Sequence, residues 1–301
     1  MTPRQLLRSV RSLIARPVED PDASEARQLV AHRRHARAGD YSFAGEAALV
    51  ETLLEQLEVR QGYAADIAAS DGVSQSCTVG LYRKGWRGLA VEFDPEKFSK
   101  LAYAYEEFDV VLTRCKVTPS NVASVLRAAE VPSDFDFLNL DIDSYDLAVI
   151  EGVLSAGFRP KLISMEINEK IPPPLYFTVL FADDHVWKGD HFYGCSAVAA
   201  DQTVSRYGYL LQSIQANNAV FIKRDLAAAH GMVGKDVTEA YRCGYRDRAG
   251  RAEQFPWNRN VDAALDMTPE EAFAFFTQFF APYRGRYELR IASQGETALQ
   301  S

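Results

Sequence analysis

The chain has 301 residues, a formal net charge of −8 and a pI near 5.3. The length suffices for one sizeable hydrophobic core, and the acidic balance disfavours nucleic acid as a partner. Four cysteines lie far apart without a C-x-x-C pair, which is typical of reduced thiols in a cytoplasmic protein. Because no apolar run is long enough to span a bilayer, we expect no stable membrane insertion.

Residues 1–40 are rich in Arg and Ala and are interrupted by prolines, and we expect them to form a helical N-terminal arm. Residues 1–17 place apolar side chains on one helical face and arginines on the opposite face. This pattern predicts a docking helix that packs against the body of the protein or against a second subunit. A membrane-surface helix and an organellar presequence are the alternatives.

The next signal is a βαβ pattern. An apolar run at residues 64–68 stops at a turn at residues 70–72, and a polar segment with helical spacing follows over residues 73–84. A second apolar run, at residues 88–91, ends in Glu92. Strand, tight turn, helix, strand and terminal carboxylate predict a parallel sheet that binds an adenosyl group at its carboxyl edge.

The residues of this turn favour one cofactor over another. A dinucleotide site uses G-x-G-x-x-G, whereas this turn reads A-A-S-D-G-V-S, and Asp71 would repel a diphosphate. S-adenosylmethionine carries an ammonium and a sulfonium instead, so Asp66 and Asp71 favour it over NAD. Gly72 would allow close backbone approach, and Glu92 would accept hydrogen bonds from both ribose hydroxyls.

Two further strands are expected to end in carboxylates. Residues 135–140 are a short apolar run that ends at Asp141, and residues 161–168 contain Glu166 near the end of another run. Because ligands bind at the carboxyl edge of a parallel sheet, we expect Asp141 to point into the cleft. Asp143 either joins it there, or Asp143 or Ser144 caps the helix that follows.

These segments resemble a known family. DIAASDG, GWRGLAVEFDP and FDFLNLDIDSYDL are similar to motifs of the FkbM-like branch of the class I S-adenosylmethionine-dependent methyltransferases, over about residues 41–226. The resemblance implies an α/β fold with a Rossmann-like seven-stranded sheet of order 3-2-1-4-5-7-6, followed by a C-terminal helical extension at residues 227–301. The chain departs from the branch at Ala69, where a turn glycine is usual, and at the Asp-Ser pair that begins with Asp143, where Glu-Gly is usual.

The resemblance also implies which side chains surround the cofactor. Asp66, Glu92 and Asp141 should hold S-adenosylmethionine, and the segment after the third strand, at residues 109–113, should contact the adenine edge. The further residues assigned to the cofactor are Ala68, Ser70, Asp71, Gly72, Phe93, Cys115, Lys116 and Ile142.

A divalent metal is a further hypothesis. Asp141, Glu166 and Asn168 follow two neighbouring strands, and hard oxygen ligands of this kind suit Mg²⁺. The pattern resembles the metal-dependent macrocin-type sugar O-methyltransferases. The alternative is a set of carboxylates that bind the methionine ammonium and a substrate hydroxyl directly.

Residues 169–193 differ in character from their surroundings. Three consecutive prolines precede aromatic residues that alternate with charged ones, which we interpret as an acceptor-binding lid. His185 or His191 could be the general base that removes a hydroxyl proton, because the pKa of histidine lies near neutral pH. Asp143 is the third candidate catalytic residue. The two histidines lack the third soft ligand of a zinc site.

Three segments flank this region. Residues 41–57 have the spacing of an amphipathic helix, in which Glu46 either approaches the cofactor pocket or is exposed. Residues 207–223 predict a hairpin that places the last strand of the sheet antiparallel. Residues 268–280 predict a capped amphipathic helix, and in residues 227–301 we expect packing or subunit contact rather than chemistry.

The sequence therefore predicts a cytoplasmic S-adenosylmethionine-dependent methyltransferase. Its acceptor would be an oxygen of a sugar-bearing or other small hydroxylated metabolite. The alternatives are transfer to nitrogen, a non-catalytic S-adenosylmethionine-binding scaffold and an NAD-dependent Rossmann enzyme. A homo-oligomer could form through the N-terminal arm or the C-terminal extension.

Overall fold

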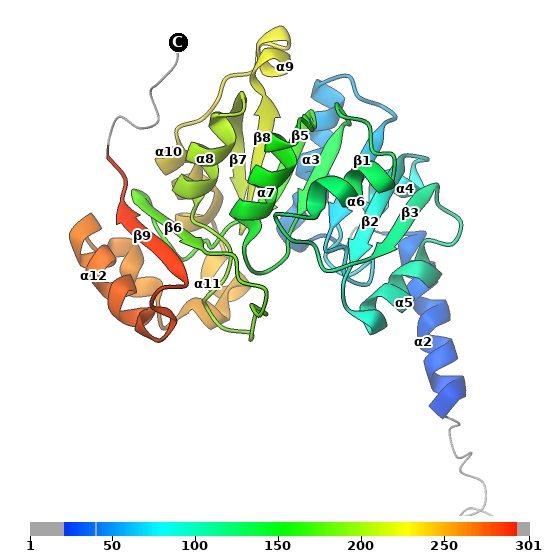
Figure 1. The fold of residues 1–301 in the computed structure, drawn as a ribbon, viewed down its shortest axis with the longest axis horizontal. Coiled ribbons are helices and arrows are strands. Elements are labelled where there is room, and N and C mark those ends of the chain that lie inside the picture. The colour runs from blue at the N-terminus through cyan, green and yellow to red at the C-terminus, as the bar shows by residue number, and fades with distance from the viewer. Residues whose placement is uncertain (1–20, 40, 294–301) are drawn as a thin grey trace, which may run out of the picture.

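The computed structural model describes residues 21–39 and 41–293, and a seven-stranded sheet of order β3-β2-β1-β4-β5-β8-β7 lies at its centre (Figure 1). Strands β1 to β5 are parallel, whereas β8 is antiparallel to both β5 and β7. Because β6 lies in a separate sheet, β7 and β8 are the sixth and seventh strands of this sheet. The predicted order 3-2-1-4-5-7-6, with its terminal hairpin, is therefore confirmed. The strands are β1 Tyr63–Ile67, β2 Arg87–Glu92, β3 Val110–Arg114, β4 Phe137–Leu140, β5 Leu162–Glu166, β7 Tyr209–Gln215 and β8 Asn218–Lys223.

Helices cover both faces of the sheet, so its central strands are buried along most of their length rather than at alternate positions. Every residue of β1 and β5 is buried. One core cluster lies under the helices α6 Val122–Ala128, α7 Asp146–Ser155 and α8 Ala197–Ser205. The other lies under α3 Glu46–Gln56, α4 Val79–Arg83, α5 Pro95–Ala104 and α9 Arg224–Ala229.

The helix predicted over residues 73–84 is shorter than expected, because α4 covers only Val79–Arg83. The side chains before it bond to the backbone and hold the chain out of the helical conformation. The carboxylate of Asp71 accepts from the backbone N–H of Val73 and Ser74, and the hydroxyl of Ser76 accepts from the backbone N–H of Thr78 and Val79.

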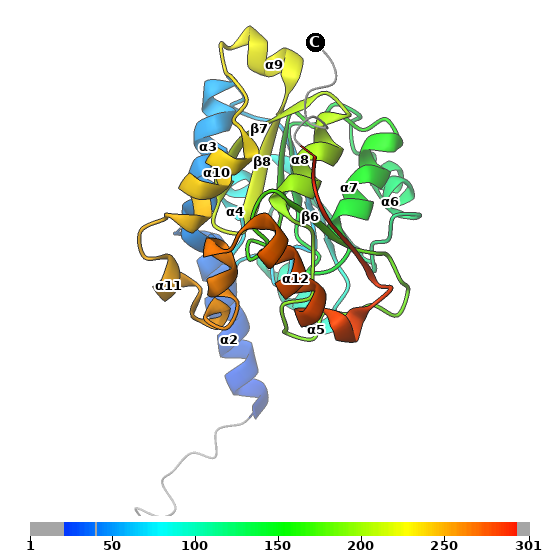
Figure 2. The same cartoon turned by 90° about the vertical axis from the view of Figure 1, so that its left-hand side faces the viewer.

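A two-stranded sheet lies beside the main one and joins the predicted lid to the C-terminal extension (Figures 1 and 2). Its strands are β6 Leu175–Val179 and β9 Tyr287–Ile291, which pair antiparallel. The extension is therefore not helical throughout, and the first half of the predicted lid contains a strand in which Phe177 is fully buried. We use the name lid loop for residues 180–193, which follow β6.

The helix α12, Pro269–Phe279, packs against this small sheet and has the predicted capping box, in which Thr268 and Glu271 bond to each other's backbone. A third core cluster around Phe177, Phe276 and Phe280 lies between α12 and the two strands. The extension also contains α10 Val237–Tyr241, a π-helical turn Arg242–Arg246 and α11 Arg251–Gln254. Three short 3-10 helices lie at Pro256–Asn258, Asp262–Asp266 and Ala281–Tyr283.

At the other end, helix α2 Pro21–Ala36 packs against α4 and α5. Arg33 forms ion pairs with Glu106 and Glu107 beyond the end of α5. The docking helix predicted within residues 1–17 lies outside the described residues. Among the helices that the structure does describe, none combines the length and apolar character needed to cross a bilayer.

Candidate active site

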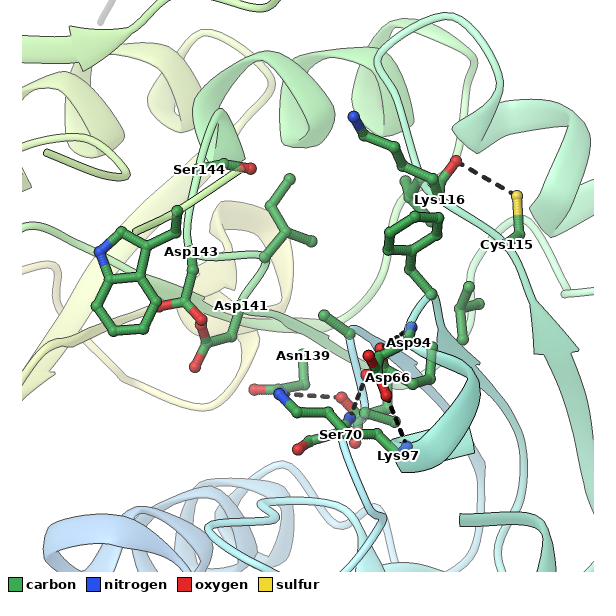
Figure 3. A pocket seen from close by; sticks show the side chains of 18 of the residues that line it. Asp66, Ser70, Asp94, Lys97, Cys115, Lys116, Asn139, Asp141, Asp143 and Ser144 are labelled. Carbon is green, nitrogen blue, oxygen red and sulfur yellow. Dashed lines mark hydrogen bonds between the residues drawn. The ribbon is translucent and has the colours of Figure 1, made fainter. Parts of the chain in front are cut away.

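A cavity of about 440 Å³ opens at the carboxyl ends of β1, β2 and β4, and Figure 3 shows the side chains that converge on it. Most of the residues assigned to the cofactor from the sequence line this cavity. These are Asp66, Ala68, Ser70, Glu92, Phe93, Cys115, Lys116, Asp141 and Ile142, together with Asp143.

The turn after β1 has an unusual backbone. Ala68 and Ser70 have φ values of 70° and 52°, in the left-handed region that side chains other than glycine rarely occupy. The backbone N–H groups of Ala68 and Ala69 both donate to the carbonyl of Val91 on β2, each at 2.9 Å. Strain of this kind is frequent at ligand sites, where the surrounding structure holds the backbone in place.

Glu92, at the end of β2, is 6% exposed and rigidly held. Its Oε2 accepts from the backbone N–H of Ser70 at 2.8 Å, and its Oε1 accepts from that of Asp94 at 2.6 Å. Each carboxylate oxygen can accept more than one hydrogen bond, so acceptor capacity remains toward the cavity. A fixed anionic acceptor at this position suits a diol.

Asp66, at the end of β1, is 2% exposed and lies deeper in the wall of the same cavity. Its carboxylate accepts from the hydroxyl of Thr78 at 2.6 Å and from the side-chain amide of Asn139 at 3.0 Å. Burial raises the pKa of Asp66, and the two hydrogen bonds oppose that rise. Because each of its two oxygens accepts one of these hydrogen bonds, the carboxyl group is held in one orientation.

Asp71 and Gly72 are not among the residues that line these two cavities, and the cofactor role expected for them stays a prediction. Burial acts to raise the pKa of Asp71, but hydrogen bonds from the N–H groups that follow it lower the pKa overall. Gly72 has φ 79°, and a Cβ there would lie 2.6 Å from Leu101 and 2.8 Å from Tyr105. Asp71 therefore stabilises the turn through these hydrogen bonds, and Gly72 allows the turn to pack closely against α5.

A second cavity, of about 660 Å³, adjoins the first. Both cavities are lined by Asp141 and Asp143, and also by Gln75, Lys97 and Trp187. Glu46 is neither exposed nor at the first cavity: it is 4% exposed, lines the second cavity and accepts a hydrogen bond from Asn218 at 2.8 Å. The second cavity also receives Phe255 and Trp257 from the C-terminal extension, where we expected no part of the site.

Three carboxylates meet at the boundary between the two cavities. Asp141, Asp143 and Glu166 each offer an oxygen, and these oxygens all lie within 4.8 Å of one another. Burial is the main cause that raises the pKa of all three. Repulsion from Asp143 adds to the rise for both Asp141 and Glu166, whereas a hydrogen bond with Glu166 opposes it for Asp141. The Oε2 of Glu166, which is 4% exposed, has no hydrogen-bond partner among the described residues. A buried carboxylate oxygen without a partner is stabilised when a cation or a hydrogen-bond donor binds to it.

The metal set predicted from the sequence differs from this trio in one member. Asn168 lines neither cavity in the described part of the chain, and its amide donates to the backbone carbonyls of His191 and Tyr193, each at 2.9 Å. It therefore ties the end of the lid loop to the strand. Asp143, which has φ 54°, stands in the position that we had expected Asn168 to take.

Asp146 holds the turn that carries this trio. Its carboxylate accepts from the backbone N–H of Ile142 at 2.8 Å and of Ser144 at 3.1 Å, and the residue is completely buried. Burial raises the pKa of Asp146 to about 7. The expectation that Asp143 caps the following helix is wrong, because no side-chain cap is present at its N-terminus and Asp146 makes the local bonds instead.

A buried ion pair that was not predicted from the sequence lines the second cavity. Lys170 Nζ lies 3.2 Å from Glu169 Oε1, and both side chains are at most 2% exposed. The hydroxyl of Tyr193 and the amide of Asn258 each donate to Glu169, at 2.7 Å. Because Asn258 lies in the C-terminal extension, this network fixes the extension to the edge of the site. Nothing in the local sequence indicated it, since the partners are 89 residues apart.

The two histidines of the lid loop lie at different cavities. His185 is 7% exposed at the first cavity, where its ring packs against Tyr145 and Phe192, and its Nε2 has no partner within the described ranges. His191 lines the second cavity, with a ring nitrogen 3.0 Å from the side-chain oxygen of Asn260. Burial lowers the pKa of both histidines, so both are neutral at pH 7.

Lys116 lines the first cavity (Figure 3), but its ammonium group bonds to the backbone of the lid loop. Its Nζ donates to the backbone carbonyl of Asp183 at 2.6 Å, and that of His185 lies 3.5 Å away. The bond fastens the lid loop over the cavity. Cys115, half-buried beside it, donates to the carbonyl of Lys116 at 3.4 Å.

Comparisons with known proteins were made on both sequence and structure. No protein-family model matches the chain, and no curated protein matches it. A matching solved structure is an S-adenosylmethionine-dependent methyltransferase from Clostridium acetobutylicum (13% identity, TM-score 0.39, 61% of this chain and 92% of that chain). Another is a TehB-like methyltransferase from Corynebacterium glutamicum (16% identity, TM-score 0.33, 68% of this chain and 100% of that chain). With TM-scores this low, neither similarity bears on the activity, and the resemblance to the FkbM-like branch stays a prediction.

Proposed function

We propose that the chain is an S-adenosylmethionine-dependent methyltransferase that acts on an oxygen of a small hydroxylated molecule. The observation that carries this proposal is the pair of adjoining cavities, which share Asp141 and Asp143 as their common wall. A transferase needs two substrates held so that their reacting atoms meet, and this arrangement supplies one compartment for each. The four cysteines, all within the described residues, form no disulfide, which is consistent with a cytoplasmic enzyme.

The first cavity fits S-adenosylmethionine. Glu92 is held by two backbone N–H groups and would accept from the ribose hydroxyls, while Asp66 and Asp141 would face the methionine ammonium. The bound cofactor supplies a methyl group whose sulfonium is its own leaving group. NAD fits less well, because the carboxylates in this cavity would repel its diphosphate.

A Mg²⁺ ion fits the boundary between the cavities, where Asp141, Asp143 and Glu166 would hold it. The fit rests on the clustered oxygens and on the partnerless, buried Oε2 of Glu166. When bound, Mg²⁺ lowers the pKa of a coordinated hydroxyl. One of these carboxylates would also orient that hydroxyl by accepting its single hydrogen bond.

His191 is the general base that the geometry supports best. It lines the acceptor side and is neutral, so it can take the proton of the hydroxyl as the carbon–oxygen bond forms and the carbon–sulfur bond breaks. His185 lies on the cofactor side, where it packs within the lid loop and helps to exclude water.

Isothermal titration with S-adenosylhomocysteine, with and without Mg²⁺, tests the cofactor assignment. We expect micromolar binding that Glu92→Ala abolishes, whereas the matched variant Glu96→Ala, on the exposed first turn of α5, binds like the wild type. NAD binding in place of S-adenosylhomocysteine would overturn the proposal. If turnover of the Glu166→Ala variant in EDTA equals that of the wild type, the proposed metal has no role in the reaction. If kcat is unchanged in His191→Ala, His191 is not the general base.

A further inference from the structure

The second cavity has an aromatic rim built from two distant parts of the chain. Trp187, in the lid loop, and Trp257, in the C-terminal extension, are 40% and 55% exposed and both line it. Each ring is backed by another aromatic residue, Trp187 by Tyr193 at 5.9 Å and Trp257 by Phe255 at 5.5 Å. The indole N–H of Trp187 donates to the carbonyl of Asp190 at 2.8 Å, which fixes its orientation. Large apolar surfaces left open at a cavity mouth favour a ligand with a flat apolar face.

Deeper in the cavity, the groups that lack partners are hydrogen-bond acceptors. Glu166 Oε2 and Asn217 Oδ1 are both buried without a partner in the described part of the chain, and both residues line this cavity. Burying an acceptor without a hydrogen-bond partner is energetically unfavourable. A ligand that donates hydrogen bonds, through hydroxyl or ammonium groups, would remove that cost.

The charge of the cavity lining favours ammonium groups over hydroxyl groups as the hydrogen-bond donors of the ligand. Six carboxylates line the cavity, those of Glu46, Asp141, Asp143, Glu166, Glu169 and Asp190, against the two ammonium groups of Lys97 and Lys170. Lys170 is already engaged by Glu169, at 3.2 Å. A single divalent ion at the trio would leave the lining acidic. Phosphate and carboxylate groups on the acceptor are therefore repelled, and a cationic nitrogen is attracted.

We propose that the acceptor is a polyhydroxylated ring that carries a protonated amino group, as in an amino sugar or an aminocyclitol. One face of the ring lies against Trp187 and Trp257, and the amino and hydroxyl groups donate to the carboxylates below. This inference deepens the proposed function and depends on it for the reaction, but not for the binding.

Binding of matched rings that differ in charge tests the inference. The full chain, with and without S-adenosylhomocysteine, is titrated with D-glucosamine, D-glucose and D-glucose 6-phosphate, and then with 2-deoxystreptamine and scyllo-inositol. We expect each amino compound to bind about tenfold or more tightly than its neutral counterpart, and the phosphate not to bind. The inference is overturned if the phosphate binds as well as the amine, or if no amino compound binds.

Variants locate the binding site. We expect Trp257→Ala to weaken binding of the amino ring at least about threefold and Trp257→Phe to retain part of it. Phe181→Ala is the matched control, since Phe181 is an exposed aromatic of the same lid loop outside the described linings of both cavities. Equal effects of Trp257→Ala and Phe181→Ala would contradict the assignment to this cavity.

Two further outcomes separate this inference from the proposed function. If S-adenosylhomocysteine fails to bind while the amino ring binds with the expected selectivity, the proposed function fails and the inference stands. If neutral rings bind only with Mg²⁺ and an amino group brings no gain, the carboxylates serve a metal alone and the inference is wrong.

Discussion

Ala68 and Ser70 show how single residues shape the turn after β1. Ala69 stands where a turn glycine was expected from the sequence, but the left-handed backbone lies at its two neighbours instead. A residue other than glycine in that region costs roughly 1–2 kcal/mol. The turn keeps this conformation because bonds to Val91 and Glu92 hold it.

At Ala68, we expect substitutions to follow the backbone rather than side-chain size. Ala68→Gly should change the free energy of unfolding by less than about 1 kcal/mol, because relief of strain is offset by the greater entropy loss of glycine. Ala68→Val should destabilise by more than about 1 kcal/mol, since a β-branched residue is a strong outlier at positive φ. Equilibrium urea unfolding measures both. A similar loss in Ala228→Val, on exposed helix α9, would show that strain is not the cause.

Among elements, helix α8 carries a buried acid that has no part in the proposed chemistry. Asp201 is 7% exposed, and burial raises its pKa to about 6, although Ser205 donates a hydrogen bond to it. A carboxyl group whose pKa is higher in the folded state favours folding when protonated. Its contribution is lost as the pH rises from the unfolded pKa, near 3.9, through about 6.

Asp201→Asn should therefore stabilise the protein above pH 6 and have little effect below the unfolded pKa. A pKa difference of about two units corresponds to roughly 3 kcal/mol, so we expect a gain of about 1–3 kcal/mol at high pH. Urea unfolding of wild type and variant across the pH range checks this. The exposed Asp134→Asn serves as control, and a gain independent of pH would contradict the explanation.

The small sheet and α12 depend on one aromatic residue. Phe280 is 1% exposed and packs against Phe177, Phe276 and Tyr287, with ring centroids 5.1, 5.8 and 5.9 Å away. Phe280→Ala should lower the free energy of unfolding by about 3–5 kcal/mol, because a buried ring is replaced by a cavity. Thermal or urea unfolding measures the loss. The half-buried Phe273→Ala should lose less, and equal losses would mean that the cluster is not centred on Phe280.

At the scale of the whole molecule, the lid loop follows β6 of the small sheet and contributes His185 and Trp187 to the wall of the first cavity. Lys116, which follows β3, donates to the carbonyl of Asp183, and Arg286 next to β9 forms an ion pair with Asp184. The loop is thus fastened from both sides. Cofactor exchange requires these contacts to open if the cavity holds S-adenosylmethionine.

Lys116→Met should speed dissociation of S-adenosylhomocysteine severalfold and leave its association rate nearly unchanged. The reason is that the variant removes a contact of the closed loop while the methionine side chain keeps most of the packing. Stopped-flow measurement of both rates tests this. Lys188→Met, an exposed lysine of the same loop, is the control. A change confined to the association rate would mean that Lys116 attracts the ligand rather than fastening the loop.

Local patterns in the sequence were enough to predict the main sheet, its terminal hairpin and the capped helix α12. Each depends on residues close in the chain: buried apolar runs for β1 and β5, the Thr268 capping box for α12. The carboxylates at the ends of β1, β2 and β4 line the first cavity for the same reason, because parallel strands deliver their carboxyl ends to one edge.

Contacts between distant segments decided the rest. The pairing of β6 with β9 joins residues more than a hundred positions apart, and the network of Glu169 and Asn258 brings the C-terminal extension to the second cavity. Asp143, rather than Asn168, joins Asp141 and Glu166 because its left-handed backbone directs it there, while the amide of Asn168 satisfies the lid loop. The sequence by itself thus determined the sheet and its acidic edge, which follow from local periodicity. Only the tertiary structure decided the acceptor side, because its walls come from segments with no local signal of their association.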